Sequence, residues 1–179
     1  MPPGILKGKI TLGVLNSTVT VQSATELDVV GAIPPPILAL PFYTESLTNW
    51  NGWVGGGWGG TSTMGSTTVA REGSKSIKID YVGGYGSPLQ IGGATISLTP
   101  YTTFKLSIYG APGSDGKKIT IGINGVNGKS VLTIVEGKWT DYAIPITTLT
   151  TATSLNEIWV QEYSGTGGFT IYVDAIGLN

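Results

Sequence analysis

The segment IKIDY, at residues 77–81, alternates apolar side chains with Lys78 and Asp80. A period of two residues is typical of a strand with one buried face and one face in water. Three further segments share this period: FKLSI (104–108), ITIGI (119–123) and FTIYV (169–173). Clusters of turn-forming residues separate the strands: residues 110–116, 124–128 and 164–168. No helical period of comparable strength occurs, so the sequence predicts an all-β protein built as a two-sheet antiparallel β-sandwich.

The charge of the chain is low and balanced. Its 179 residues include 10 Lys and Arg and 11 Asp and Glu, which gives a net charge of −1. Such a chain offers no positive field to a phosphate backbone or an anionic bilayer, so we expect no nucleic-acid partner. The absence of cysteine from the sequence excludes disulfides, thiol catalysis and thiolate metal sites. Any metal ion must therefore use oxygen ligands.

Three successive prolines at residues 34–36 set the N-terminal part of the chain apart. Proline lacks an amide proton and favours an extended spacer, so we interpret residues 34–41 as a linker. Residues 1–33 precede it and hold three expected short strands: 9–15, 18–22 and 26–30. About 33 residues are too few for an independent core. The segment therefore packs on the rest of the chain, pairs with another chain or is the severed end of a domain. We favour the severed end.

Two features bear on where the protein acts. The longest apolar stretch, residues 32–42, is broken by prolines and is shorter than the ~20 residues that cross a bilayer, so we expect no membrane insertion. The start, MPPGILKGK, lacks the apolar segment and cleavage site of a signal peptide. Charged residues make up only 12% of the chain, about half the usual share, which suits a secreted module. We therefore expect a piece of a longer exported chain.

Particular segments carry two resemblances to known families. Residues 8–32, GKITLGVLNSTVTVQSATELDVVGA, resemble the closing strands of an immunoglobulin-like IPT/TIG domain. From residue 42 onward the chain resembles non-catalytic carbohydrate-binding modules of the galactose-binding-like jelly-roll type. The second resemblance is carried by three segments: FYTESLTNWNGW (42–53), REGSKSIKIDY (71–81) and FTIYVDAIGLN (169–179). It covers about three quarters of the chain and implies a jelly-roll module at residues 42–179, in a secreted bacterial protein that acts outside the cell or on its surface.

Tryptophans gather in a glycine-rich segment, NWNGWVGGGWGG, at residues 49–60. The C–H face of a pyranose packs on an aromatic ring, and sugar hydroxyls need amide or carboxylate partners. We therefore expect a carbohydrate site whose ring platforms are Trp50, Trp53, Trp58 and Tyr85 and whose amides are Gln90 and Gln161. Because tryptophans near the first strand of a sandwich often fill its core, any one of the three can instead be structural. We expect at least one to face water.

The segment IWVQEY, residues 158–163, adds to this site. Alternate residues share one face of a strand: Trp159, Gln161 and Tyr163 on one side, Ile158 and Val160 on the other. The aliphatic pair is the natural core face, so we expect the other three side chains on the outer surface. Trp139 enters a run that continues into alternating apolar residues, and we expect it to be a core or edge residue outside the site.

The second resemblance also implies a structural calcium ion that ties together the first strand, a bend after the early loop and the last strand. Glu45, Glu72 and Asp174 occupy the matching places, with the backbone of residues 73–75 beside Glu72. Calcium takes about six to eight oxygen ligands, so these acids must converge in the fold. The alternative is that Glu45 and Glu72 are solvated surface acids. Ala175 follows Asp174 at a place where such modules often carry a second acid.

Residue types that perform catalysis are scarce. Glu157 and Glu162 are an odd number of positions apart, so on a regular strand they point to opposite faces and make a poor pair of glycosidase carboxylates. The sequence has no histidine for a serine triad, and the single arginine, Arg71, leaves little charge for a polysaccharide lyase. We therefore expect the protein not to be an enzyme.

These features together predict non-catalytic binding of an extracellular polysaccharide. Balanced charge favours a neutral glycan, with a β-glucan or another plant cell-wall polymer as the first expectation. A linked catalytic domain in a longer parent chain is an expected partner. The alternative is a structural or adhesive surface module that self-associates through free strand edges, with Ile37, Leu38 and Leu40 as a docking strip. A protein-binding module of a larger complex is a third interpretation.

Overall fold

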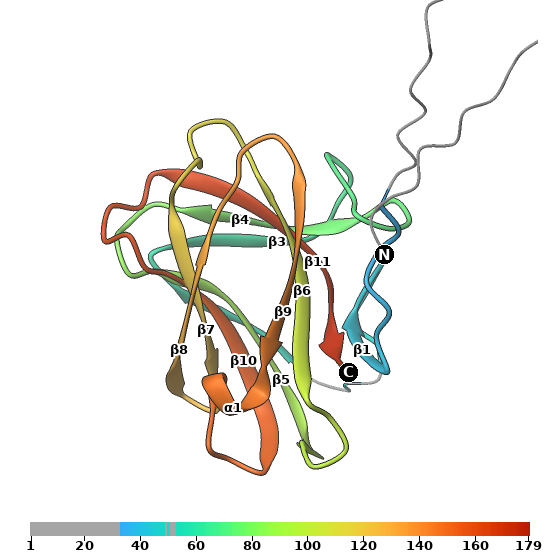
Figure 1. Cartoon of the computed structure of the whole chain (residues 1–179). Coiled ribbons are helices and arrows are strands. Elements are labelled where there is room, and N and C mark those ends of the chain that lie inside the picture. Colours follow the sequence, from blue (N-terminus) through green and yellow to red (C-terminus); the bar gives the residue numbers. More distant parts are fainter. Residues whose placement is uncertain (1–32, 49, 51–52) are drawn as a thin grey trace, which may run out of the picture. The chain divides into compact units, whose positions relative to one another are not determined.

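The computed structural model describes residues 33–48, 50 and 53–179 (Figure 1). Contacts divide the chain into Met1–Pro34 and Pro35–Asn179, and the second unit contains all the strands given below. The IPT/TIG-like segment predicted for residues 1–33 lies outside the described residues, except for Ile33. Within the described ranges, no helix is both long enough and apolar enough to pass through a bilayer.

The described part is built almost entirely from strands joined by turns. The strands are β1 (Leu40–Tyr43), β2 (Trp53–Trp58), β3 (Gly60–Ser66), β4 (Ser76–Tyr81), β5 (Ser87–Ser97), β6 (Thr103–Gly110), β7 (Lys118–Ile123), β8 (Val126–Thr133), β9 (Trp139–Pro145), β10 (Ser154–Glu162) and β11 (Phe169–Leu178). In this part of the chain a single short helix, α1 (Ile146–Leu149), connects β9 to β10. The predicted all-β class is confirmed.

The strands form two antiparallel sheets that pack against each other (Figure 1). One sheet has the order β3-β4-β11-β6-β9, with β1 also paired to β11, and the other has the order β2-β5-β10-β7-β8. Neighbours are distant in sequence, because β10 lies between β5 and β7 and β11 lies between β4 and β6. The predicted two-sheet antiparallel sandwich is confirmed.

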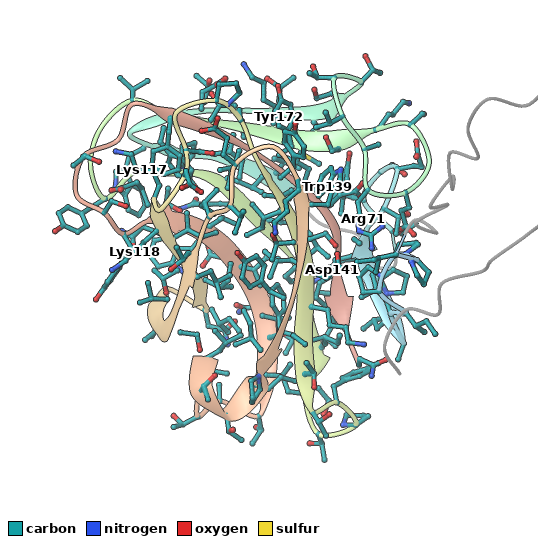
Figure 2. The ribbon with its side chains drawn as sticks, turned by 45° about the horizontal axis from the view of Figure 1, so that its top comes forward. Arg71, Lys117, Lys118, Trp139, Asp141 and Tyr172 are labelled. Atoms are coloured by element: carbon teal, nitrogen blue, oxygen red, sulfur yellow. The ribbon has the colours of Figure 1, made fainter. Side chains whose placement is uncertain are left out.

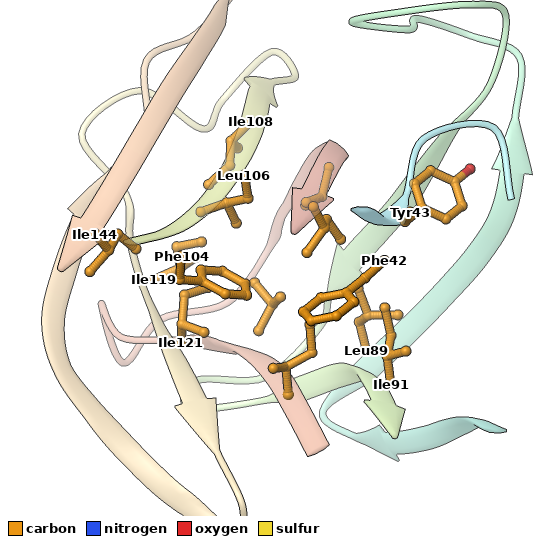
Figure 3. Packing of buried hydrophobic residues seen from close by; sticks show 14 of the residues in the cluster. Phe42, Tyr43, Leu89, Ile91, Phe104, Leu106, Ile108, Ile119, Ile121 and Ile144 are labelled. Carbon is orange, nitrogen blue, oxygen red and sulfur yellow. The ribbon is translucent and has the colours of Figure 1, made fainter. Parts of the chain in front are cut away.

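The core lies between the sheets and consists of the alternate residues that the period of two predicts (Figure 3). Its fully buried members come from both sheets: Ile77, Ile79, Ile171 and Val173 from the six-stranded sheet, and Ile119 and Ile121 from the five-stranded sheet. Burying one such side chain contributes about 1.5–3 kcal/mol to folding. These rows fix the register, since a slip of one residue would turn a whole row toward water.

Strand β11 is the centre of the six-stranded sheet and pairs with three strands. β6 pairs along one of its edges. On the other edge β4 pairs with residues 169–173 and β1 pairs with residues 176–178. Ala175, between these two ranges, has a left-handed backbone with φ at 49°, and the register with β6 shifts at the same place. The change of partner on this edge therefore coincides with a local irregularity of the strand.

The predicted linker, residues 34–41, overlaps the start of the sandwich. Ala39 donates its backbone N–H to the carbonyl oxygen of Leu178 at 2.9 Å, and Leu40 and Pro41 pair with β11. Proline, which lacks a donor for a central ladder, is tolerated in such a short outer strand. The sandwich therefore begins before residue 42.

Candidate functional site

The outer face of the five-stranded sheet carries side chains of the segment IWVQEY. On β10, Ile158 and Val160 are buried in the core between the sheets. Trp159 and Gln161 alternate with them and lie on the opposite face, as the period of two predicts. This outer face is the candidate binding site.

The indole of Trp159 lies across the backbone of β7. A Cβ atom on Gly122 would be 1.4 Å from Trp159 Nε1, so the ring occupies the space that a side chain at position 122 would need. Trp159 Nε1 is shielded from solvent and has no hydrogen-bond partner among the described residues. Packing on Gly122, and not a hydrogen bond, therefore holds this ring. On the β5 side Trp159 is paired with Gln90, which is half-buried.

Trp58 ends β2 and remains 46% exposed. Its ring packs edge-to-face against Trp159, with the ring centroids 5.3 Å apart and the planes at 73°. Its Nε1 donates a hydrogen bond to the carbonyl oxygen of Tyr85 at 3.0 Å. This indole is thus fixed by a neighbouring ring and by its N–H, while nearly half of its surface stays in water.

Tyr85 lies in the glycine-rich loop between β4 and β5 and is 58% exposed. Its backbone is left-handed, with φ at 59°, a conformation that residues other than glycine adopt infrequently. Its carbonyl oxygen accepts hydrogen bonds from Trp58 Nε1 and from Gln161 Nε2, both at 3.0 Å. This loop therefore connects the end of β2 to the outer face of β10.

Tyr163 follows the end of β10, at the position that the period of two assigns to the same face as Trp159 and Gln161. Its side chain is 48% exposed, and its backbone N–H donates to the carbonyl oxygen of Lys118 at 2.8 Å. The residues that we call the ring surface are Trp58, Tyr85, Trp159, Gln161 and Tyr163. Trp53 begins β2 opposite Gly92, and only its backbone is described, so its role as a ring platform stays a prediction.

Trp50 is a core residue, which corrects its prediction as a ring platform. The side chain is 2% exposed, and its ring centroid lies 4.7 Å from that of Phe42. Its Nε1 donates to the carbonyl oxygen of Ala94 at 2.9 Å, and a Cβ atom on Gly93 would come within 2.5 Å of the ring. Trp50 fills the sandwich because Gly93 leaves room for its ring, and a buried ring offers no face to a ligand.

Trp139 lies on the six-stranded sheet, together with Tyr172 and the ion pair of Arg71 and Asp141 (Figure 2). It begins β9 and is half-buried against Tyr109, with ring centroids 5.7 Å apart. β9 is the last strand of this sheet. The expectation that Trp139 is a core or edge residue is therefore confirmed.

Asp174, one of the predicted calcium ligands, is fully buried in β11. Its Oδ2 accepts hydrogen bonds from the backbone N–H groups of Arg71 at 2.8 Å and Glu72 at 3.3 Å, and its Oδ1 accepts one from Ala175 at 2.8 Å. Loss of hydration raises the pKa of this carboxyl to about 6, although the three N–H groups act in the opposite direction. Asp174 therefore ties the bend at residues 71–72 to the last strand.

Glu45 binds the next residues of this bend. Its Oε1 accepts hydrogen bonds from the backbone N–H groups of Ser74 and Lys75, and its Oε2 accepts one from Ser74 Oγ at 3.1 Å. The backbone N–H of Ser74 is the main cause that lowers the pKa of Glu45. Gly73 makes this approach feasible, because a Cβ atom there would lie 1.5 Å from Glu45 Oε1.

The predicted calcium ligands Glu45, Glu72 and Asp174 are not gathered into one cluster of acids. Among residues 33–48, 50 and 53–179, no group of three histidine, cysteine or acidic side chains lies close enough to hold a metal ion. Around Asp174 and Glu45 the bend presents N–H groups, where calcium would need oxygen ligands. The donor set does not fit a three-carboxylate site, so the calcium binding that the sequence predicts is put to a direct test with a chelator.

A chelator is expected to leave the stability of the module unchanged. Because hydrogen bonds from residues 71–75 to Asp174 and Glu45 organise the bend, excess EDTA or excess calcium chloride should each shift the thermal midpoint by less than about 1 °C. Differential scanning calorimetry in both solutions measures the effect. A midpoint that rises by several degrees with calcium and falls again with EDTA would contradict this account of the bend.

Sequence patterns do not single out Glu162, which they mark only as a poor partner for Glu157. In the structure Glu162 is fully buried at the end of β10, and its carboxylate accepts a hydrogen bond from the backbone N–H of Tyr85. One signal could have found it. An acidic residue directly before a turn of serine and glycine, here YSGTGG at residues 163–168, is placed to accept the free N–H groups of that turn.

Comparison with known proteins bears on the fold. No family model matches the chain, and no curated protein matches it. Among solved structures, it is similar to a mutant of a family 29 carbohydrate-binding module complexed with mannohexaose, at 14% identity and a TM-score of 0.53 over 76% of this chain and 87% of that one. A mutant complexed with cellulohexaose matches at 14% identity and a TM-score of 0.51 over 76% and 86%.

A further structure of a family 29 carbohydrate-binding module matches at 13% identity and a TM-score of 0.51, over 76% of this chain and 84% of that one. At such low identity the likeness concerns the fold. The sandwich therefore has the jelly-roll architecture of these modules.

Proposed function

We propose that this protein binds a polysaccharide without converting it, and that the ring surface is the binding site. The observation that carries the proposal is the state of Trp58, which is 46% exposed although Trp159 and the carbonyl oxygen of Tyr85 hold it in place. A ring that is already fixed loses little conformational freedom when a ligand stacks on it. The entropy cost of ordering the ring therefore offsets less of the favourable contact energy.

Two amides lie on the same face as the rings: Gln161, which belongs to the ring surface, and Gln90 beside it. Gln161 is only 8% exposed, and its Nε2 donates to the carbonyl oxygen of Tyr85, so this amide fixes the loop of Tyr85 and its contact with a sugar hydroxyl stays a prediction. Gln90, beside Trp159 on the neighbouring strand, supplies a second amide on the same face. Rings for the C–H faces and amides for the hydroxyls are the combination that a pyranose requires.

A neutral glycan is the ligand class that suits this surface, because no residue of the ring surface carries a charge. A polyanion would find no cation among these side chains and no favourable net charge on the chain. We propose a β-glucan or another plant cell-wall polymer. Modules of the same fold were complexed with mannohexaose and cellulohexaose, which makes these two oligosaccharides the first ligands to test.

The proposed role is to hold a linked enzyme or a cell surface close to its glycan, outside the cell. The two acids of β10 are not arranged to cleave a glycosidic bond, since Glu162 is fully buried on the core side while Glu157 belongs to the outer face. Glycosidases need two carboxylates that flank one bond. The proposed task is therefore recognition alone.

Replacing Trp58 with alanine should weaken glycan binding about thirtyfold, because the stacking area of one half-exposed indole contributes about 2 kcal/mol. Isothermal titration with cellulohexaose and mannohexaose measures the loss of affinity. The matched control is Trp139→Ala, which removes a half-buried ring from the other sheet and should leave affinity within about twofold. Failure of the wild-type chain to bind any of a broad panel of neutral glycans would reject the proposed function.

Self-association is the second candidate function, and the outer strand β8 favours it. Val126 and Val131 of this strand are exposed, and β8 has a neighbour on one side only in the described sheet. An edge strand with apolar side chains can add to the sheet of another copy, although Tyr142 Oη already donates to the carbonyl oxygen of Thr133 at the end of this strand. Light scattering over a range of protein concentrations separates the two functions, since growth of particles without any response to sugars would favour an adhesive module.

A further inference from the structure

Glu162 is a fully buried acid directly beside the ring surface. Its carboxylate accepts three backbone hydrogen bonds. Oε2 binds the N–H groups of Tyr85 at 2.6 Å and Gly165 at 2.9 Å, and Oε1 binds the N–H group of Ser164 at 2.6 Å. Neither of the two ion pairs found among the described residues includes Glu162. Backbone groups of two loops therefore satisfy this carboxylate.

The two loops are distant in sequence and lie against each other through glycines. Residues 82–86 join β4 to β5, and residues 163–168 join β10 to β11. A Cβ atom on Gly84 would lie 2.3 Å from the carbonyl oxygen of Gly165, and one on Gly165 would lie 2.9 Å from Tyr85 Oη. The carboxylate of Glu162 joins the two loops by hydrogen bonds, beside the backbone bonds from Glu162 N–H to the carbonyl oxygen of Gly86 at 2.8 Å and from Gly168 N–H to that of Tyr81 at 2.7 Å.

The bond from Glu162 bears directly on the backbone of Tyr85. A left-handed conformation in a residue other than glycine persists only where its surroundings fix it. Tyr85 is fixed at both of its backbone groups, by Glu162 at its N–H and by Trp58 and Gln161 at its carbonyl oxygen. A series of hydrogen bonds therefore runs from the buried acid through Tyr85 to the exposed indole.

We infer that Glu162 is the positioning residue of the ring surface: its carboxylate holds the two loops together and thereby sets the orientation of Tyr85 and Trp58. This inference rests on the proposed function, since it concerns how the same surface is kept ready for a glycan. Glu162 does not touch the ligand. It acts by fixing the carbonyl oxygen to which Trp58 and Gln161 donate.

A carboxylate is needed at this position because three N–H groups converge there. A buried N–H without an acceptor is unfavourable, and an apolar side chain would leave all three unsatisfied. Glutamine has one oxygen that accepts and one NH2 group that donates. Its NH2 group would therefore face a backbone N–H group, which is also a donor. We therefore expect a graded series, with Glu162→Gln impaired and Glu162→Ala impaired more strongly.

The first test needs no ligand. Hydrogen exchange of the Trp58 indole N–H, followed by NMR, reports its hydrogen bond to Tyr85. Glu162→Ala should accelerate this exchange about tenfold, and Glu162→Gln should give an intermediate rate. Unchanged exchange in both variants would overturn the inference.

The matched control is Asp174→Asn. Asp174 is also fully buried and also accepts three backbone N–H groups, but it ties a different bend on the other sheet. Its substitution removes the charge from a carboxyl that is buried to the same degree and should leave Trp58 exchange within about twofold of the wild type. Equal acceleration in Asp174→Asn would show general loosening of the fold and overturn the assignment to Glu162.

The second test measures affinity for cellulohexaose and mannohexaose by titration. Glu162→Gln should lose about tenfold, and Asp174→Asn should lose less than about twofold. Faster exchange with full affinity would overturn the positioning role. If the wild-type chain binds neither these sugars nor a wider glycan panel, the proposed function fails, and the exchange comparison still decides whether Glu162 positions Trp58.

Discussion

Gly122→Ala is expected to lower glycan affinity about a hundredfold. The new Cβ atom would lie 1.4 Å from Trp159 Nε1 and 1.9 Å from Trp159 Cδ1, so the indole must leave its place on β7. Its displacement removes one stacking ring and also the edge against which Trp58 packs, together about 3 kcal/mol. Titration with the ligand that the wild-type chain binds most tightly measures this loss.

Gly93→Ala is the control for this substitution. It also places a Cβ atom against an indole, within 2.5 Å of Trp50 Cδ1, but Trp50 lies in the core. Gly93→Ala should therefore lower the free energy of unfolding while the folded molecules keep their affinity within about threefold. The opposite pattern, lost affinity in Gly93→Ala and full affinity in Gly122→Ala, would show that the outer face of the five-stranded sheet is not the site.

Asp174 is expected to make the protein less stable at neutral pH than in mild acid. The carboxyl has a pKa of about 6 in the folded protein and the ordinary value of 3.8 when unfolded. Between these values the folded chain keeps a proton that the unfolded chain has lost, so this stabilisation is complete below pH 3.8 and is lost as the pH rises through 6. The difference corresponds to about 3 kcal/mol.

Comparison of the wild type with Asp174→Asn isolates this contribution from the other acids. Asp80 and Asp141 have lowered pKa values, because hydrogen bonds and nearby cations outweigh their burial, and they act in the opposite direction with pH. Urea unfolding at pH 4 and pH 7 should show that the advantage of the wild type over Asp174→Asn shrinks by about 2.4 kcal/mol toward pH 7. An advantage that grows with pH would show that Asp174 is stabilised as a carboxylate, as a bound calcium ion would require.

The period of two is sufficient to predict much of the sandwich. Strands β4, β6, β7 and β11 alternate large aliphatic residues with polar ones, and burial of these rows decides their register. The same rule places Trp159 and Gln161 on the outer face, because Ile158 and Val160 must be buried. Where a strand has strong aliphatic alternation, the sequence therefore determines both its existence and its orientation.

The rule fails in the glycine-rich segment at residues 49–60. Glycines give no preference for either face, so the pattern cannot separate Trp50, which is buried, from Trp58, which is exposed. What separates them is tertiary: Gly93 leaves space for one ring, and the carbonyl oxygen of Tyr85 binds the N–H of the other. Both partners are more than 25 residues away along the chain and belong to other elements.

The acidic residues show a second limit of prediction from the sequence. The sequence marks Glu45, Glu72 and Asp174 as potential ligands because carboxylates bind calcium, but a carboxylate accepts backbone N–H groups equally well. Which partner it meets depends on the direction of the peptide groups in the bend at residues 71–75, and that direction follows from the packing of the bend. The role of Glu162 is hidden for the same reason.

The position of β11 has a consequence for synthesis on the ribosome. Three strands made earlier, β1, β4 and β6, find their shared neighbour only in the segment translated after them, Phe169–Leu178. Until that segment leaves the ribosome, the six-stranded sheet lacks its central strand. The aliphatic rows of β1, β4 and β6 then lack part of their cover. Such non-local pairing slows folding. Nascent chains are therefore expected to keep apolar segments exposed, and to be prone to aggregation, until the last strand has been translated.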